Sequence, residues 1–203
     1  MTQPRKAEYD IAPIFTNRWS PRAFTGAAVD DETLYALFEA ARWAPSANNA
    51  QPWRFIYARK DSASWPAVFG LLNENNQRWA ANASVLIVLL SARTHVRPGS
   101  SEPSPLVSHS LDAGAAWASL AFQAYYAGLS AHAIGGFDRA KARIVLNVPE
   151  GYQVEVAIAV GKRADSSVLP RDLQEREWPT QRRPVNAFVA EGRFAFEDPG
   201  ERG

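Results

Sequence analysis

Apolar and polar positions recur along this chain with two different periods, and these periods predict its elements. After the acidic residues 30–32, which suit the first turn of a helix, apolar side chains recur at helical spacing at Leu34, Leu37, Phe38 and Ala41. Residues 84–91 instead form a continuous apolar run, which is typical of a strand covered on both faces. The pattern therefore predicts helices packed on a buried sheet.

Shorter periodic stretches complete the predicted order of elements. They indicate strands at 53–58 and 154–161, a short strand before the glycines at 135–136, and helical segments at 65–72, 75–81 and 138–146. Residues 7–16 form a short amphipathic segment before them. Residues 95–105 are polar and contain three prolines, so they predict a loop.

Residues 106–126 form the most apolar stretch and are rich in alanine. About 21 helical residues span about 30 Å. A helix that is apolar all round is buried all round, and its small residues allow a neighbour to approach closely. We expect this helix to be central and to pack on its own symmetry mate, with Gly128 at its C-terminal cap.

Composition limits the classes of function. The 203 residues suit one domain, and 22 basic against 21 acidic side chains give no general field for nucleic acid or for a membrane. There is no cysteine, and the three histidines, His95, His109 and His132, are not in metal-ligand spacing, so we expect no metal site and read them as structural or surface residues. No apolar run reaches a membrane span and no signal-peptide pattern is present, so we expect a cytoplasmic protein.

The loop between the first long helix and the strand at 53–58 carries candidate chemistry. Pro45 and Pro52 hold its ends in turn or extended conformations. Between them lie uncharged donors and acceptors at Ser46, Asn48, Asn49 and Gln51. This set suits a neutral planar ring better than a metal or a phosphate. By spacing alone, an ordinary turn in which these side chains satisfy the backbone stays open.

Two further stretches are candidate binding elements. Arg18 and Arg22 flank Ser20 in a non-helical turn, and two arginines in this arrangement suit a phosphate, although a solvated basic face is the alternative. Gly135 and Gly136 allow a backbone to come close to a ligand, although a plain turn is the alternative.

Taken together, these stretches resemble the nitroreductase family of FMN-dependent oxidoreductases. The resemblance runs from about Ile14 to Phe194 and rests on five motifs in the family's order: Arg18-Trp19-Ser20-Pro21-Arg22, Pro45-Ser46 with Asn49 and Gln51-Pro52-Trp53, Gly136-Phe137-Asp138, Pro149-Glu150-Gly151, and Gln181-Arg182-Arg183. It implies an α+β fold, a three-layer α/β/α sandwich with a central mixed, mainly antiparallel sheet, in an intertwined homodimer. Residues 1–203 would form one domain, with 164–203 as a C-terminal arm packed on the partner subunit.

The resemblance also implies which residues bind FMN. The arginine turn and Arg182 would bind the phosphate, and Asn76 would contact the pyrimidine edge of the flavin. The backbone at Gly135 and Gly136 would contact the N5 edge. The loop at Pro45 would reach the flavin of the other chain. The cofactor-binding residues implied in this way are Arg18, Trp19, Ser20, Arg22, Pro45, Ser46, Ala47, Asn49, Asn76, Trp79, Ile134, Gly135, Gly136, Arg182 and Arg183.

Two positions depart from the family pattern. Trp79 stands where some members have lysine, and Thr180 occupies a position that is often basic. The resemblance therefore implies no lysine charge next to the flavin O2. It implies that Arg18, Ser20, Arg22 and Arg182 alone would bind the phosphate.

The implied activity is FMN-dependent transfer of hydride from NAD(P)H to a nitroaromatic, quinone or similar conjugated acceptor by a ping-pong mechanism. The sequence has no Gly-x-Gly-x-x-Gly element of the kind that binds a dinucleotide such as FAD. We predict no catalytic side chain, because the flavin does the chemistry. The alternatives are a specialised relative (a dehalogenase, a dehydrogenase or a flavin-fragmenting enzyme), a flavin-binding protein without turnover, and an interaction protein whose arginines are only surface.

Overall fold

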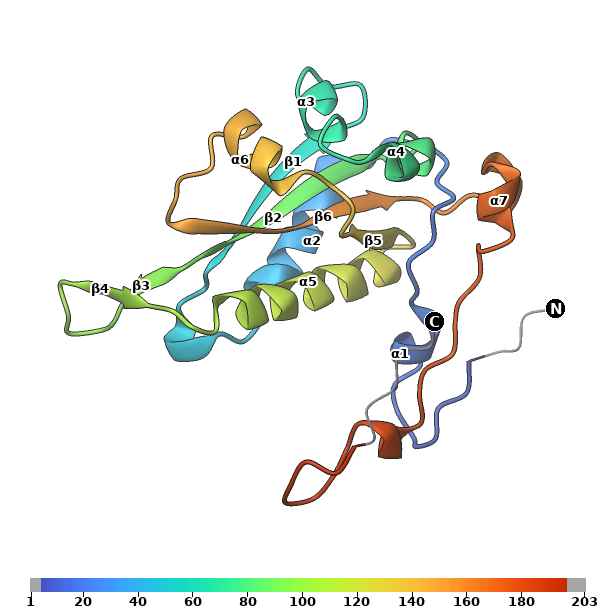
Figure 1. The fold of residues 1–203 in the computed structure, drawn as a ribbon. Coiled ribbons are helices and arrows are strands. Elements are labelled where there is room, and N and C mark those ends of the chain that lie inside the picture. Colours follow the sequence, from blue (N-terminus) through green and yellow to red (C-terminus); the bar gives the residue numbers. More distant parts are fainter. Residues whose placement is uncertain (1–4, 197–203) are drawn as a thin grey trace.

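The structure is a computed structural model in which residues 5–196 are described, and its centre is one antiparallel sheet (Figure 1). The strands run in the order β1-β2-β6-β5. Their bounds are Trp53–Arg59 for β1, Val85–Ala92 for β2, Tyr152–Gly161 for β6 and Ser130–Ile134 for β5. Every strand pair within residues 5–196 is antiparallel, so the parallel component of the predicted mixed sheet does not occur in this part of the chain.

Helices cover both faces of the sheet, and the predicted α+β three-layer fold is confirmed. The two long helices α2 (Asp31–Arg42) and α5 (His109–Tyr126) lie together on one face. The shorter helices α3 (Trp65–Phe69), α4 (Glu74–Ala80) and α6 (Arg139–Val145) cover the other (Figure 1).

Strand β2 shows why this sequence needs two covering layers. Val85, Ile87 and Leu89 belong to the core under α2 and α5, whereas Leu86, Val88 and Leu90 belong to the core under α3, α4 and α6. Side chains alternate between the faces of a strand, so a run of consecutive apolar residues is buried on both sides. The continuous run read from the sequence at 84–91 is confirmed.

The ends of the helices follow local chemistry. Asp30 accepts a hydrogen bond from the Thr33 N–H at 2.7 Å at the start of α2, and Asp138 accepts one from the Lys141 N–H at 2.8 Å at the start of α6. Gly128 has φ +70°, the left-handed conformation that ends a helix and that glycine adopts without strain. These caps confirm the predicted helix boundaries.

Helix α5 is buried on one side only. Its alanines at 113, 116, 121 and 124 and Leu120 pack in the core, but the side chains of Leu111 and Tyr126 are 77% and 70% exposed. The expectation of a helix buried all round is thus not met within a single chain. An exposed apolar strip remains along the longest helix.

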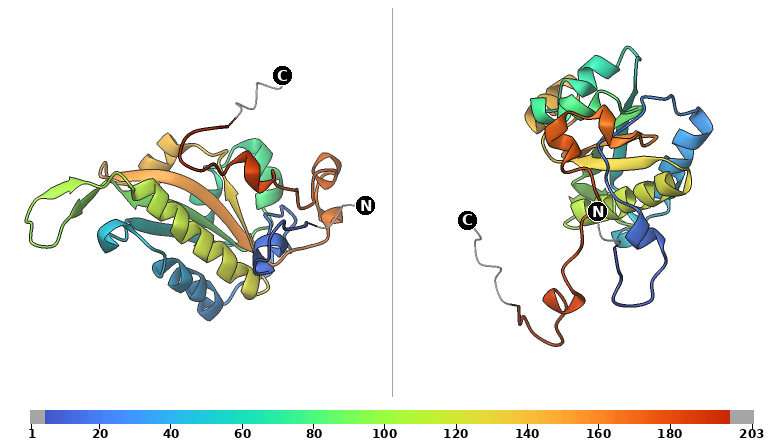
Figure 2. Two further views of the ribbon diagram at one scale, coloured as in Figure 1. Left: turned by 90° about the horizontal axis from the view of Figure 1, so that it is seen from below. Right: turned by 90° about the vertical axis from the view of Figure 1, so that its right-hand side faces the viewer.

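The segment predicted as a loop at 95–105 forms a small hairpin instead. Strands β3 (Thr94–Val96) and β4 (Pro103–Pro105) pair antiparallel and project from one end of the molecule (Figures 1 and 2). Proline lacks an N–H, and an edge strand tolerates this loss because its outer side faces solvent. The hairpin therefore accommodates the prolines that favoured a loop.

Both ends of the described chain leave the three layers together (Figures 1 and 2). The N-terminal segment holds α1 (Ile14–Asn17), and the C-terminal segment holds α7 (Arg171–Gln174) and the 3₁₀ turns Ser166–Val168 and Val185–Ala187. Arg5 Nε donates to the Thr180 carbonyl at 2.9 Å, and the Val185 N–H donates to Glu8 at 2.8 Å. The two ends therefore form one paired extension.

Candidate functional site

A basic cavity lies where the paired ends meet the sheet. Its volume is about 430 Å³. The predicted residues Arg18, Trp19, Ser20, Arg22 and Arg182 all line it, with Arg5, His132, Arg176, Trp178, Pro179 and Thr180. Residues from opposite ends of the sequence are thus brought to one place. Arg183 does not line this cavity. It lines an adjoining groove beside the N-terminal segment, which Arg5 and Arg182 also line.

The cavity concentrates positive charge. Burial, followed by the proximity of Arg182, lowers the pKa of Arg18. Burial followed by Arg182 and Arg18 lowers the pKa of Arg5. Within residues 5–196, no carboxylate forms an ion pair with Arg18 or Arg182. Cations held close together without counter-charges favour a bound anion.

Glu177 fixes the arginine turn and forms an ion pair with one arginine of the cavity, Arg22. Its buried carboxylate accepts the N–H groups of Arg22 and Ala23 at 2.6 and 2.9 Å and lies 3.7 Å from the Arg22 guanidinium. A carboxylate that accepts backbone N–H groups defines the conformation of the chain it binds. Arg5 adds to this, since its Nη1 donates to the Thr16 and Arg18 carbonyls at 3.2 and 2.8 Å.

Asn76 and the glycine pair meet beside α4. Asn76 Nδ2 donates to the Gly136 carbonyl at 2.9 Å, and the Asn73 N–H donates to the same oxygen at 3.1 Å. A Cβ on Gly136 would lie 2.5 Å from the side-chain nitrogens of both asparagines, so any other residue there would displace these two amides. A Cβ on Gly135 would meet nothing within 4 Å, so that backbone faces open space. The Ile134 side chain is buried in the core and leaves only its backbone available.

Trp79 contacts both Asn76 and His132, and so connects the Asn76–Gly136 contact to the basic cavity. Its side chain is 2% exposed, its Nε1–H donates to Asn76 Oδ1 at 3.2 Å, and its ring lies 4.7 Å from that of His132. Direct contact between Trp79 and a ligand stays a prediction. The structure shows Trp79 supporting two residues that lie nearer the surface.

The amide-rich loop between α2 and β1 lies at the opposite end of the molecule from the basic cavity. Asn48, Asn49 and Gln51 all have positive φ, between 47° and 52°, which is uncommon for residues other than glycine. The Ser46 hydroxyl accepts the Gln51 N–H at 3.0 Å and helps to hold this conformation. Clustered strain of this kind is found at ligand-binding segments.

Asp112 connects the loop to α5. The Ala47 N–H and the Ser108 hydroxyl donate to its buried carboxylate at 3.2 and 3.0 Å. Arg18 and Trp19 instead share a cavity with Tyr125, near the other end of α5. At 1.5 Å per residue, Asp112 and Tyr125 are about 20 Å apart along the helix. One chain therefore holds the candidate residues of the loop (Pro45, Ser46, Ala47 and Asn49) apart from the arginines.

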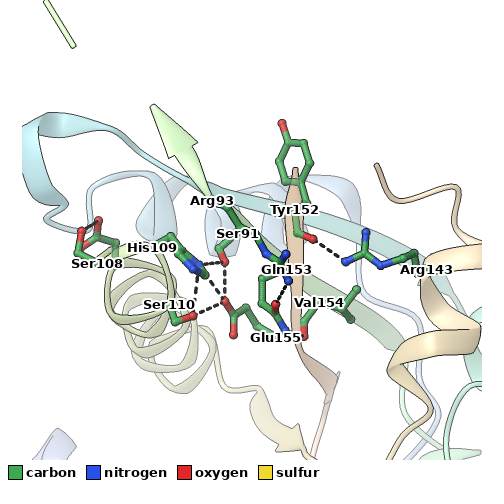
Figure 3. Close-up of polar contacts among 11 residues, drawn as sticks. Ser91, Arg93, Ser108, His109, Ser110, Arg143, Tyr152, Gln153, Val154 and Glu155 are labelled. Carbon is green, nitrogen blue, oxygen red and sulfur yellow. Dashed lines mark hydrogen bonds and ion pairs between the residues drawn. The ribbon is translucent and has the colours of Figure 1, made fainter. Parts of the chain in front are cut away.

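A second polar cluster lies at the same end of α5 (Figure 3). His109 Nδ1 lies 2.7 Å from Ser91 Oγ, and the hydroxyls of Ser91 and Ser110 donate to Glu155 Oε1 at 2.5 and 2.7 Å. The β2–β6 register shifts at Leu89/Leu90, which leaves Glu155 in a β-bulge. The bulge lets a strand residue join the helix N-terminus to the sheet, and His109 is structural, as expected.

The structure is thus an α+β protein with a basic cavity that residues near both ends of the described chain line. The sequence profile of the nitroreductase family matches residues 15–72 and 61–162, so the chain belongs to the nitroreductase family. Within residues 5–196, no group of three histidine or acidic side chains is placed to hold a metal ion. No helix among the described elements is long and apolar enough to cross a bilayer.

Individual relatives agree with this family. A solved structure described as "the oxidoreductase containing FMN" is 47% identical, with a TM-score of 0.92 over 97% of this chain and 100% of that one. The "Putative NADH dehydrogenase/NAD(P)H nitroreductase SCO7141" of Streptomyces coelicolor is 38% identical over 78 residues, a match that spans only 38% of either protein. The "Putative NAD(P)H nitroreductase Spy0809" of Streptococcus pyogenes is 25% identical over 85% of this chain and 94% of its own.

Two residues of the basic cavity were not predicted as site residues from the sequence. Arg5 precedes the first predicted element, and nothing in the sequence indicated that the N-terminal segment returns to Thr180. His132 sits in a short apolar strand, where spacing alone suggested only a structural or surface role, yet it lines the basic cavity. The alternation of apolar residues around it on β5 was the only available signal.

Proposed function

We propose that this chain is an FMN-dependent oxidoreductase that takes hydride from NAD(P)H and reduces nitroaromatic, quinone or similar small conjugated acceptors in a ping-pong reaction. The observation that carries the proposal is the arginine cavity assembled from both ends of the chain. Membership of the nitroreductase family supports it, as do relatives named for FMN and for NAD(P)H.

The residues present fit the phosphate of FMN. Arg18 and Arg182 face one cavity and have no carboxylate partner within residues 5–196, and Ser20 Oγ lies 3.4 Å from Arg18 Nη1. Guanidinium groups bind phosphate oxygens through charge-assisted hydrogen bonds. We therefore assign the phosphate to Arg18, Ser20, Arg22 and Arg182, with Trp19 beside them.

The other candidate residues orient the ring. When bound, the flavin supplies the hydride-transfer chemistry, so we assign no catalytic side chain. Asn76 is held by Gly136 and Trp79 and presents a fixed amide for the pyrimidine edge. The open backbone at Gly135 offers an N–H donor near it.

The working form in this proposal is a homodimer. The exposed apolar strip of α5 and the distance between the loop and the arginines support it. A partner lying along α5 would cover Leu111 and Tyr126 and bring its Pro45 loop to the cavity of the first chain. We further propose that residues 164–203 pack on the partner and that the protein acts in the cytoplasm.

Anaerobic titration of the purified protein tests the activity. We expect a yellow protein that releases FMN on denaturation, is bleached by NADH or NADPH, and is reoxidised by a nitroaromatic or a quinone. Bound FMN that neither nucleotide bleaches would identify a flavin-binding protein without turnover. A colourless protein that does not bind added FMN would contradict the proposal.

A further inference from the structure

His132 occupies an unusual place in the basic cavity. It lies on β5, its ring lies 4.7 Å from the buried Trp79 ring, and its Nδ1 is 2.9 Å from the Pro21 carbonyl oxygen. The residue also lines the cavity that contains Arg18 and Arg22. An uncharged ring is thus fixed in position among guanidinium groups.

The contacts define which atom of the ring is free. A carbonyl oxygen only accepts, so Nδ1 carries the proton and Nε2 carries a lone pair. Burial, partly opposed by the bond to Pro21 and assisted by Arg22 and Arg18, lowers the pKa of His132 to about 4. No donor bonds to Nε2 within residues 5–196. At neutral pH His132 is therefore uncharged, and it brings an unprotonated ring nitrogen to the wall of the cavity.

A fully ionised phosphate monoester cannot satisfy this acceptor. Its phosphate oxygens only accept hydrogen bonds, and two acceptors that face each other repel. A ligand that suits both the arginines and His132 must carry an anion and, a few bonds away, a hydroxyl or N–H donor. A phosphorylated polyol chain has both groups.

We propose that Nε2 of His132 accepts a hydrogen bond from a hydroxyl group of the bound ligand, so that the cavity selects a polyol phosphate over a bare phosphate. The inference rests on the proposed function, in which this polyol is the ribityl chain of FMN. His132 is then a specificity-determining residue, and Trp79 positions it by packing against its ring in a tilted arrangement.

Binding measurements test the inference without turnover. Fluorescence quenching gives the Kd of FMN and of analogues that each lack one ribityl hydroxyl. Competition gives the affinity of a bare phosphate, for which methyl phosphate at about pH 8 is suitable because it is then fully ionised and has no O–H donor. His132→Leu removes the acceptor and keeps an apolar contact with Trp79, whereas His132→Gln restores an acceptor. Analogues binding to the wild-type protein need no variant to fold.

One neutral hydrogen bond corresponds to about twofold to tenfold in affinity. We expect His132→Leu to weaken FMN by this factor, His132→Gln to recover part of it, and phosphate to be unaffected. One deoxy analogue should bind the wild-type protein more weakly than FMN does, by the same factor. The Kd of this analogue should not change in His132→Leu.

Two results would overturn the inference alone: FMN affinity unchanged in His132→Leu, or every analogue as sensitive to this substitution as FMN itself. A wild-type protein that does not bind FMN would instead overturn the proposed function, and the inference with it.

Discussion

At the level of single residues, the basic cavity differs from an ordinary basic surface in how its charges are arranged. Some surface arginines of this chain pair with acids, as Arg78 does with Asp172 at 2.6 Å. Arg18 and Arg182 instead both line the cavity and contact carbonyl and hydroxyl oxygens. Their charges therefore remain available to a ligand.

Replacing either cavity arginine should weaken FMN binding. A charge-assisted hydrogen bond contributes about 1.5–3 kcal/mol, so Arg18→Ala or Arg182→Ala should raise the Kd of FMN about tenfold to a hundredfold. Fluorescence titration at low flavin concentration measures this. Arg183→Ala is the matched comparison because Arg183 lies outside the cavity. Equal effects at positions 182 and 183 would contradict the assignment.

His132 should make stability depend on pH. Its folded pKa of about 4 lies below the unfolded value of 6.5, so above pH 6.5 both states are neutral and its contribution is constant. As the pH falls from 6.5 to 4, only the unfolded chain binds the proton, and the free energy of unfolding falls by about 3 kcal/mol. Urea unfolding of the wild type and of His132→Leu across this range isolates the effect. Parallel pH profiles would refute it.

At the level of elements, α5 connects the two separated parts of the site. Its N-terminal end holds the loop through Asp112 and the sheet through the Ser91–Glu155 cluster (Figure 3). Its C-terminal end reaches the cavity shared by Arg18 and Tyr125. A shift of this helix would displace both parts.

Removing the Asp112 carboxylate should loosen the loop. Asp112→Ala leaves the Ala47 N–H and the Ser108 hydroxyl without their acceptor, and an unsatisfied buried group costs about 1–3 kcal/mol. Urea unfolding should show that loss, and hydrogen exchange at the Ala47 amide should speed up. Asp112→Asn keeps one acceptor oxygen and should lose less. The prediction fails if the two substitutions behave alike.

The sequence was most informative about elements with strong periodicity. The apolar run at 84–91 defined a doubly covered strand, and Asp30 and Asp138 marked two helix starts, because these signals act between near neighbours. The β3–β4 hairpin was missed because its prolines favour a loop, and the bulge at Glu155 was missed because it depends on pairing with the distant strand β2. In the site, Arg18, Arg22 and Arg182 could be predicted from motifs. Arg5 and His132 could be assigned to the cavity only from the folded structure.

At the level of the whole molecule, the paired ends carry apolar side chains into solvent. Phe188 and Phe194 are 59% and 83% exposed in the single chain. Burying a large apolar side chain contributes about 1.5–3 kcal/mol, so such groups favour a covering surface. In our proposal that surface belongs to the second subunit.

Truncation after Val185 tests this role. The shortened chain keeps Arg18 and Arg182 but loses Phe188, Val189 and Phe194. We expect a monomer or an aggregate that has lost FMN, as measured by size-exclusion chromatography with detection at flavin wavelengths. A yellow dimer with one FMN per truncated chain would contradict the predicted role of residues 164–203.

The construction of the cavity from both ends of the chain also sets an order of events during synthesis. Arg18 is synthesised before the residues of the sheet, and Arg182 is synthesised after them, since the last strand, β6, ends at Gly161. A nascent chain can therefore fold its three layers before Arg182 is available. In our proposal the capture of the cofactor thus follows the formation of the layers.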